Sequence, residues 1–156
     1  MQKFPITRDG YNRLLEELKQ YKTFERPNII RAISEAREQG DLSENADYQA
    51  AKERQSFIEG KINDLEDKIS RSEIINTSGI KDTKVKFGAI VSLIDCDTEI
   101  KAQYQIVGEY EADINKGLIA INSPLARSLI GKEPGDYAEV NTPKGIKEYE
   151  LIDVEY

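Results

Sequence analysis

Residues 40–48 read Gly-Asp-Leu-Ser-Glu-Asn-Ala-Asp-Tyr and separate two long stretches of helical periodicity. Before this segment, apolar residues recur at steps of three and four at Tyr11, Leu14, Leu18 and Tyr21, and again at Ile29, Ile33 and Ala36. After it, the same spacing links Ala51, Gln55, Ile58, Ile62, Leu65 and Ile69. This spacing is typical of one helix face, and the short connection makes the two helices antiparallel. The sequence therefore predicts a coiled-coil hairpin within residues 1–78, with residues 40–48 at its tip.

The first helix has a capped start and a disturbed middle. Thr7 or Asp9 can cap its first turn. Arg26-Pro27 is expected to bend or interrupt it, because proline lacks an amide hydrogen and crowds the preceding turn.

The second half of the chain has a different periodicity. Asn76-Thr77-Ser78-Gly79 reads as a linker. Alternating patterns beyond it predict strands at 85–87, 89–94, 102–107, 117–121, 137–140 and 146–154. Ser123-Pro124 begins one short helix, which ends at Gly131. The predicted fold class is α+β, with an N-terminal antiparallel two-helix coiled-coil hairpin followed, in residues 79–156, by an antiparallel sheet with one short helix.

The composition excludes several kinds of chemistry. The 156 residues contain no histidine and one cysteine, Cys96, so Ser-His and Cys-His nucleophiles and the usual zinc ligand sets are excluded. A single cysteine fits a reducing cytoplasm, and we expect Cys96 to be half-buried in a strand. No apolar run is long enough to cross a bilayer, and the N-terminus lacks a signal-peptide core. These features predict a cytoplasmic protein with no membrane partner.

The net charge of −7 argues against general nucleic-acid binding through a basic surface. Residues 79–156 contain 9 Lys and Arg against 14 Asp and Glu, so five of the seven excess negative charges lie there. Basic patches are therefore expected on the hairpin.

Asp41 and Glu44 are three residues apart, so at a helix start they share one face. Two interpretations are open. The pair can form a capping box, or it can supply oxygen ligands to a divalent cation. Two exposed carboxylates hold Mg²⁺ poorly by themselves, so a metal site here requires further ligands from a partner. Both interpretations can hold in different states.

Basic residues flank this acidic segment at Arg31, Arg37, Lys52 and Arg54. They form either an ordinary solvated helix surface or a patch that guides a phosphate backbone toward the tip. The aromatic residues Tyr48 and Phe57 fit packing better than base stacking.

Two long motifs in this chain resemble one known family. Residues 36–48, followed by Ala50-Ala51-Lys52, are similar to the tip of the bacterial Gre transcript-cleavage factors. Residues 108–121, residues 122–132 and the closing segment 148–156 resemble the GreA branch of that family. The resemblance covers essentially the whole chain without a large insertion.

The resemblance implies an FKBP-like domain in residues 79–156 that docks on the rim of the RNA polymerase secondary channel, while the hairpin of residues 1–78 enters the channel. Such a factor is not itself an enzyme. It stimulates the polymerase's own cleavage of backtracked RNA and so rescues arrested elongation complexes. We expect a monomer, because the apolar faces of both helices are used within the hairpin.

The resemblance also assigns roles at the tip. Asp41 and Glu44 match the carboxylates that help to hold the second catalytic Mg²⁺ together with polymerase ligands, so no cofactor is expected on this chain alone. Arg37 and Lys52 match a basic patch beside the nascent RNA 3′ end, although lysine lacks the bidentate phosphate contact of arginine. The residues expected to position the tip are Leu42, Ser43, Asn45 and Tyr48.

Proteins of other functional classes could also contain such a hairpin or such a sheet. A regulator without cleavage activity could use the same hairpin to block the channel. A prolyl isomerase requires an aromatic-lined apolar cleft, and the second half offers only Phe87 and a few tyrosines. A tRNA-gripping arm is disfavoured by the net charge and the acidic tip, and a chaperone arm remains a further alternative.

Overall fold

The computed structural model describes residues 2–40 and 45–156. Contacts divide the chain into two compact units, residues 11–72 and residues 2–10 together with 73–156. Each unit has its own hydrophobic core. Within the described residues, no helix is long and apolar enough to cross a membrane. The functional division into a channel-entering hairpin and a polymerase-docking domain stays a prediction, because contacts alone do not test it.

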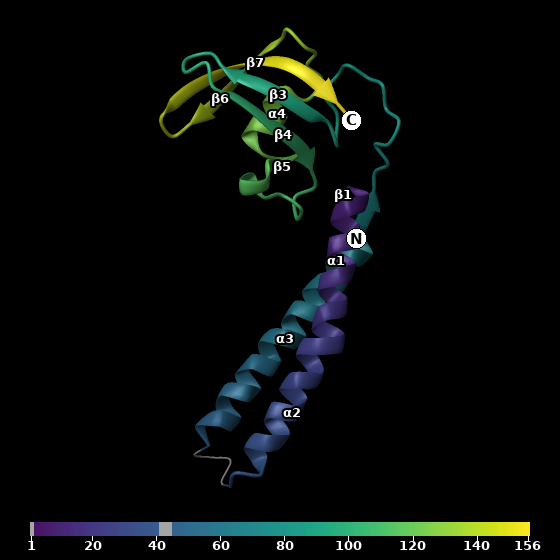
Figure 1. Ribbon diagram of the computed structural model, residues 1–156, viewed down its shortest axis with the longest axis vertical. Helices are drawn as coiled ribbons and strands as arrows, with labels where there is room; N and C mark the ends of the chain where they lie inside the picture. The colour runs from purple at the N-terminus through teal and green to yellow at the C-terminus, as the bar shows by residue number, and fades with distance from the viewer. Residues whose placement is uncertain (1, 41–44) are drawn as a thin grey trace. The chain divides into compact units, whose positions relative to one another are not determined.

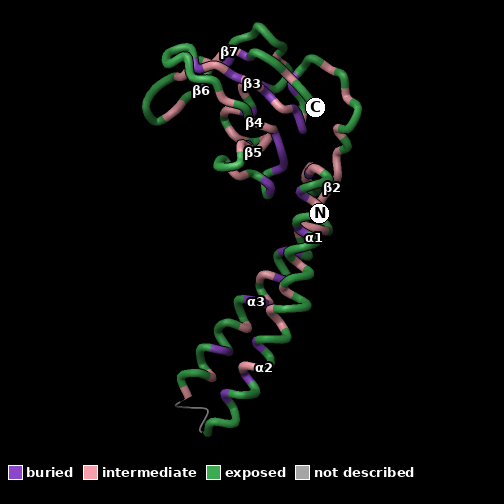
Figure 2. Tube along the Cα trace, in the orientation of Figure 1, coloured by how far each residue is buried: buried purple, intermediate pink, exposed green. Residues whose placement is uncertain are grey.

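The first unit is a helical hairpin (Figure 1). One arm consists of α1 (Arg8–Gln20), the π-helix η1 (Tyr21–Glu25) and α2 (Arg26–Arg37), and the other arm is α3 (Ala46–Arg71). The core between the arms is formed by Ile29, Ile33, Ala51, Ile58 and Ile62. Figure 2 shows buried positions recurring along α2 and α3 between exposed ones. The predicted antiparallel hairpin and its apolar seam are confirmed.

The π-helix occupies the place where Pro27 was expected to disturb the first helix. The Arg26 amide donates to the Tyr21 carbonyl, five residues back, and Pro27 lies in the first turn of α2. A strict seven-residue repeat from Tyr21 would bury positions 25 and 28, whereas Ile29 and Ile33 are the buried residues. A turn with i to i+5 bonding holds one residue more than an α-turn. It therefore takes up the extra residue, and the helix continues without a break.

The second unit contains a five-stranded sheet in the order β5-β4-β3-β7-β6. Its strands are β3 (Ile90–Asp95), β4 (Lys101–Val107), β5 (Leu118–Ala120), β6 (Tyr137–Thr142) and β7 (Gly145–Glu155). A 3₁₀ turn, η2 (Ile114–Lys116), precedes β5, and the helix α4 (Pro124–Leu129) follows it. Ser123 caps α4 as predicted, and Ala126 and Leu129 of α4 join the core of the sheet. The α+β class is confirmed.

Three details differ from the sequence prediction. The sheet is mixed, because β5 runs parallel to β4 while the other neighbours are antiparallel. Residues 85–87 form no strand; Val85 is buried, but its backbone bonds to Gly131 and Lys132 after α4. Cys96 is exposed in the turn after β3 and not half-buried in a strand.

A small sheet of β1 (Phe4–Ile6) and β2 (Ser72–Ile74) lies outside the predicted elements. Immediately after β1, the Thr7 hydroxyl accepts a hydrogen bond from the Gly10 amide at 3.0 Å, so Thr7 caps α1. The buried carboxylate of Glu111 accepts from the Thr7 amide at 3.0 Å, from the Gly108 amide at 2.7 Å and from the Thr7 hydroxyl. Glu111 therefore fastens the N-terminal segment to the loop after β4.

Candidate functional site

The candidate site is the end of the hairpin where α2 gives way to α3. Gly40 follows α2 with a φ of 124°, a conformation that side chains with a Cβ rarely adopt. The predicted site residues Asp41, Leu42, Ser43 and Glu44 lie outside the described residues. The two helix ends on either side of them are described and define the surroundings of the site.

Asn45 joins the two helix ends. Its side-chain oxygen accepts from the Tyr48 amide at 3.0 Å and so caps α3. Its side-chain nitrogen donates to the Ala36 carbonyl at 2.6 Å, in the last turn of α2. One amide group thus satisfies an otherwise unpaired donor of α3 and adds a hydrogen bond to a carbonyl in the last turn of α2, which also accepts from the Gln39 amide. It therefore links the end of α2 to the start of α3.

Tyr48 provides a second link between the same two helices. Its ring packs against the hairpin core, and the Arg37 guanidinium carbon lies 5.9 Å from the ring centroid. This distance is within the range of a cation–π contact. The contact holds the cation of α2 against the first turn of α3. The interpretation of Tyr48 as a packing residue agrees with this position.

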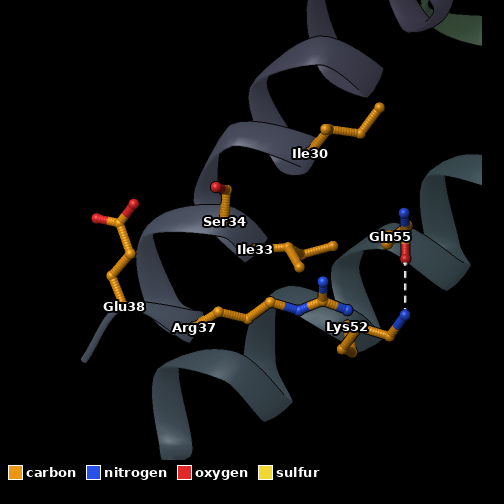
Figure 3. Close-up of a pocket in the computed structure, with 7 residues that line it drawn as sticks. All are labelled: Ile30, Ile33, Ser34, Arg37, Glu38, Lys52 and Gln55. Carbon is orange, nitrogen blue, oxygen red and sulfur yellow. Dashed lines mark hydrogen bonds between the residues drawn. The ribbon is translucent and has the colours of Figure 1, made fainter. Parts of the chain in front are cut away.

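A groove of about 420 Å³ runs between the helices next to this end. Figure 3 shows Ile30 and Ile33 pointing toward α3, and the Arg37 side chain extending toward Lys52. The Lys52 ammonium donates to the Gln55 side-chain oxygen at 3.2 Å. Arg37 and Lys52, both predicted from the sequence, therefore line one groove. Gln55, which was predicted only as part of the apolar face of α3, orients the lysine.

The four flanking basic residues differ in their partners. Arg54 pairs with Glu25 at 3.5 Å and stacks on Phe57, with its guanidinium carbon 4.9 Å from the ring centroid. In contrast, neither Arg37 nor Lys52 forms an ion pair with any residue in the ranges 2–40 and 45–156. Both side chains therefore line the groove without a direct ion pair to a described carboxylate, although Glu38 also lines it.

Ion pairs farther along the hairpin set the register of the two arms. Arg26 makes a bidentate contact with Glu59, with both nitrogen–oxygen distances at 2.9 Å, and these bonds raise the pKa of the Arg26 guanidinium. Lys22 pairs with Glu66 at 2.7 Å. Lys22 lies within the π-helix and Arg26 directly follows it, so these contacts hold the two arms in one alignment at the π-helix. This alignment in turn determines which residues face each other at the groove.

No group of three or more Asp, Glu or Cys side chains that could hold a metal ion occurs in the described part of the chain. The carboxylates of Asp41 and Glu44 are outside that part. Their oxygen atoms are of the type that Mg²⁺ prefers, but two carboxylates leave most of its octahedral positions to other ligands.

Comparisons with known proteins cover both units. Residues 4–74 match the family model "Transcription elongation factor, N-terminal", and residues 80–156 match "Transcription elongation factor, GreA/GreB, C-term". Transcription elongation factor GreA of Phenylobacterium zucineum is 58% identical over 156 residues, which cover 100% of this chain and 99% of the relative. GreA of Rickettsia canadensis is 56% identical over 154 residues, covering 99% and 95%.

Among solved structures, GreA factor homolog 1 of Thermus thermophilus is similar with 26% identity. The match covers 99% of this chain and 100% of that chain, with a TM-score of 0.45. The family assignment rests on the sequence matches and not on this score.

Proposed function

Because the chain belongs to the GreA/GreB family of transcription elongation factors, we propose that it binds bacterial RNA polymerase and stimulates cleavage of backtracked RNA by the polymerase. In this proposal the hairpin enters the secondary channel, and the C-terminal domain docks on the channel rim. The cleaved RNA has a new 3′ end in the polymerase active site, so an arrested complex resumes elongation. The protein acts as a cofactor of the polymerase and has no nuclease activity of its own.

Asp41 and Glu44 are the residues that would take part in the cleavage reaction. Each offers carboxylate oxygens, and together with polymerase ligands they would hold the second Mg²⁺ of the active site. A metal ion held in this way supplies an activated water for attack on the RNA phosphodiester. Either carboxylate is also suited to orient that water or accept its proton. Leu42 and Ser43 lie between them and would set their spacing.

The observation that carries the proposal is the joint position of Arg37 and Lys52 in one groove, between the last turns of α2 and the first turns of α3. The Arg37 guanidinium contacts the Tyr48 ring and the Lys52 ammonium bonds to Gln55, while neither forms an ion pair with a described carboxylate. Two fixed cations from opposite helices are suited to contact RNA phosphates. They would keep the RNA backbone near Asp41 and Glu44, the residues that would help to hold the metal ion.

RNA shortening in stalled elongation complexes tests the proposal. Adding the protein should release short RNA fragments faster than polymerase alone, and the double variant Asp41→Ala, Glu44→Ala should return the rate to that of polymerase alone while still binding. Asp47→Ala is the matched control, because it removes an exposed carboxylate from the first turn of α3 and should leave cleavage intact. Normal cleavage by the double variant would refute the mechanism, and no stimulation by the parent protein would refute the function.

A further inference from the structure

Strand β6 forms one outer edge of the five-stranded sheet. It pairs with β7 in an uninterrupted register from Tyr137 opposite Glu150 to Thr142 opposite Gly145. In an antiparallel pair, alternate residues bond to the neighbouring strand, so every second residue of an edge directs its N–H and C=O outward. In the described part of the chain, the backbone of residues 137–142 bonds only to β7. These outward groups form a regular row of free donors and acceptors.

Edge strands are usually protected against pairing with another chain. The common devices are lysine or proline on the strand, a bulge, or a very short strand. The opposite edge, β5, has only three residues. In contrast, the six residues of β6 read Tyr-Ala-Glu-Val-Asn-Thr and contain no lysine, proline or bulge, and Pro143 and Lys144 lie in the turn beyond it. The single charged residue on the strand is Glu139, which would repel an acidic segment but not a basic one.

The exposed face beside this edge is acidic. Glu139 of β6 lies directly opposite Glu148 of β7, a like-charged pair that destabilises a sheet. Neither these two carboxylates nor that of Glu150 forms an ion pair within residues 2–40 and 45–156. The negative charge also affects a neighbouring side chain. The charge of Glu150, and to a lesser extent burial, raises the pKa of the Tyr137 phenol, because both disfavour the phenolate.

We propose that β6 is a docking edge for an extended segment of another protein that carries lysine or arginine at alternate positions. The segment pairs with the outward backbone groups of β6 and adds a sixth strand to the sheet. Its basic side chains lie on the acidic face beside Glu139 and relieve the repulsion between Glu139 and Glu148. Apolar side chains at the alternate positions lie on the opposite face, where Ala138 and Val140 are buried.

The charge pattern argues against a second copy of this chain as the occupant. Residues opposite each other in a sheet lie on the same face. Antiparallel pairing of two β6 strands about a two-fold axis therefore brings Glu139 of one copy opposite or diagonal to Glu139 of the other. Like charges at such positions are unfavourable. A basic segment meets no such penalty.

A synthetic peptide provides the test. A fluorescent ten-residue peptide of alternating lysine and valine is titrated with the full chain, which requires no polymerase and is independent of the function proposed above. We expect saturable binding, together with slowed amide hydrogen exchange in residues 137–142. Glu139→Lys should weaken binding about tenfold or more, because one attraction becomes a repulsion. This variant should stay folded, since its lysine faces Glu148.

Two controls separate strand addition from simple charge attraction. Glu109→Lys makes the same charge change at an exposed turn residue outside the sheet and should leave the affinity unchanged. A peptide of the same charge with N-methylated alternate amides cannot pair as a strand and should not bind. Equal binding by the methylated peptide, equal loss in both variants, or no exchange protection in β6 would overturn the proposal. Self-association of the chain through β6 would also overturn it, in favour of a second copy.

Discussion

The contacts of Glu111 predict a large loss of stability when its side chain is shortened. Glu111→Ala removes an acceptor that is only 8% exposed and that takes hydrogen bonds from two backbone amides and one hydroxyl. The space around it is tight. A Cβ added at Gly10 would lie 2.1 Å from a Glu111 oxygen, so the surrounding backbone is built against this carboxylate and cannot easily close on a cavity.

The magnitude follows from the number of donors that lose a partner. Each buried donor left unsatisfied costs about 1 kcal/mol or more, so the three donors together predict a loss of about 3 kcal/mol for Glu111→Ala. Glu111→Gln is the matched comparison. Its amide oxygen can still accept from the Thr7 and Gly108 amides, which both bond to the same carboxylate oxygen. We therefore expect the glutamine variant to lose only about 1 kcal/mol.

Guanidinium unfolding followed by far-ultraviolet circular dichroism measures these losses. Amide hydrogen exchange locates them, and we expect faster exchange in residues 2–10 and 108–121 of the alanine variant. Equal losses for alanine and glutamine would refute the reasoning, because the charge and not the accepted hydrogen bonds would then be responsible. If Glu111→Ala lowered the free energy of unfolding by less than about 1 kcal/mol, water would be replacing the carboxylate as the hydrogen-bond acceptor, which would also contradict the prediction.

Two further predictions concern the hairpin core and the turn after β3. Ile58→Ala should lower the free energy of unfolding by about 3 kcal/mol, because Ile58 is 1% exposed and its removal leaves a cavity. Phe57→Ala, at the neighbouring exposed position, should lower it by less than about 1 kcal/mol. Thermal unfolding measures both, and similar losses for the two variants would contradict the described core. The Asp97 amide, then that of Thr98 and the charge of Lys147, lower the pKa of the Asp95 carboxyl below its usual value. Its contribution to stability is therefore present above the unfolded-state pKa and lost as the pH falls through the folded-state value. Unfolding curves should show Asp95→Asn less stable than the parent at pH 7, with a gap that closes below about pH 4; a constant gap would contradict this.

The hairpin could be predicted because its core residues recur at a regular spacing along the sequence. Each helix has one apolar stripe, and two such stripes on a chain that turns back at Gly40 can be buried only against each other. The spacing from Tyr21 to Ile29 also indicates the π-helix. These two core positions are eight residues apart, one more than the seven of a regular coiled-coil repeat. Pro27, from which an interruption was predicted, marks the position of this irregularity but does not indicate the kind of turn.

The sheet was predicted less completely, because alternation indicates which side chains are buried and not which strands are neighbours. The pattern of residues 117–121 is the same whether β5 runs parallel or antiparallel to β4. Val85 is buried, but its backbone bonds go to the loop after α4, so burial there does not indicate a strand. Cys96 falls just beyond the end of β3, where a boundary error of one residue changes a strand position into a turn.

At the candidate site, the sequence alone determined the residue types, their order and the family, because local spacing and motif are properties of the chain itself. Asp41 and Glu44, with Arg37 and Lys52 on either side, can be read in this way. Only the tertiary structure decided that Tyr48 holds Arg37 and that Gln55 holds Lys52 over one groove, since these contacts depend on how α2 packs on α3. Glu111 is the extreme case: it binds Thr7 across 104 positions of sequence, a separation that no local pattern can indicate.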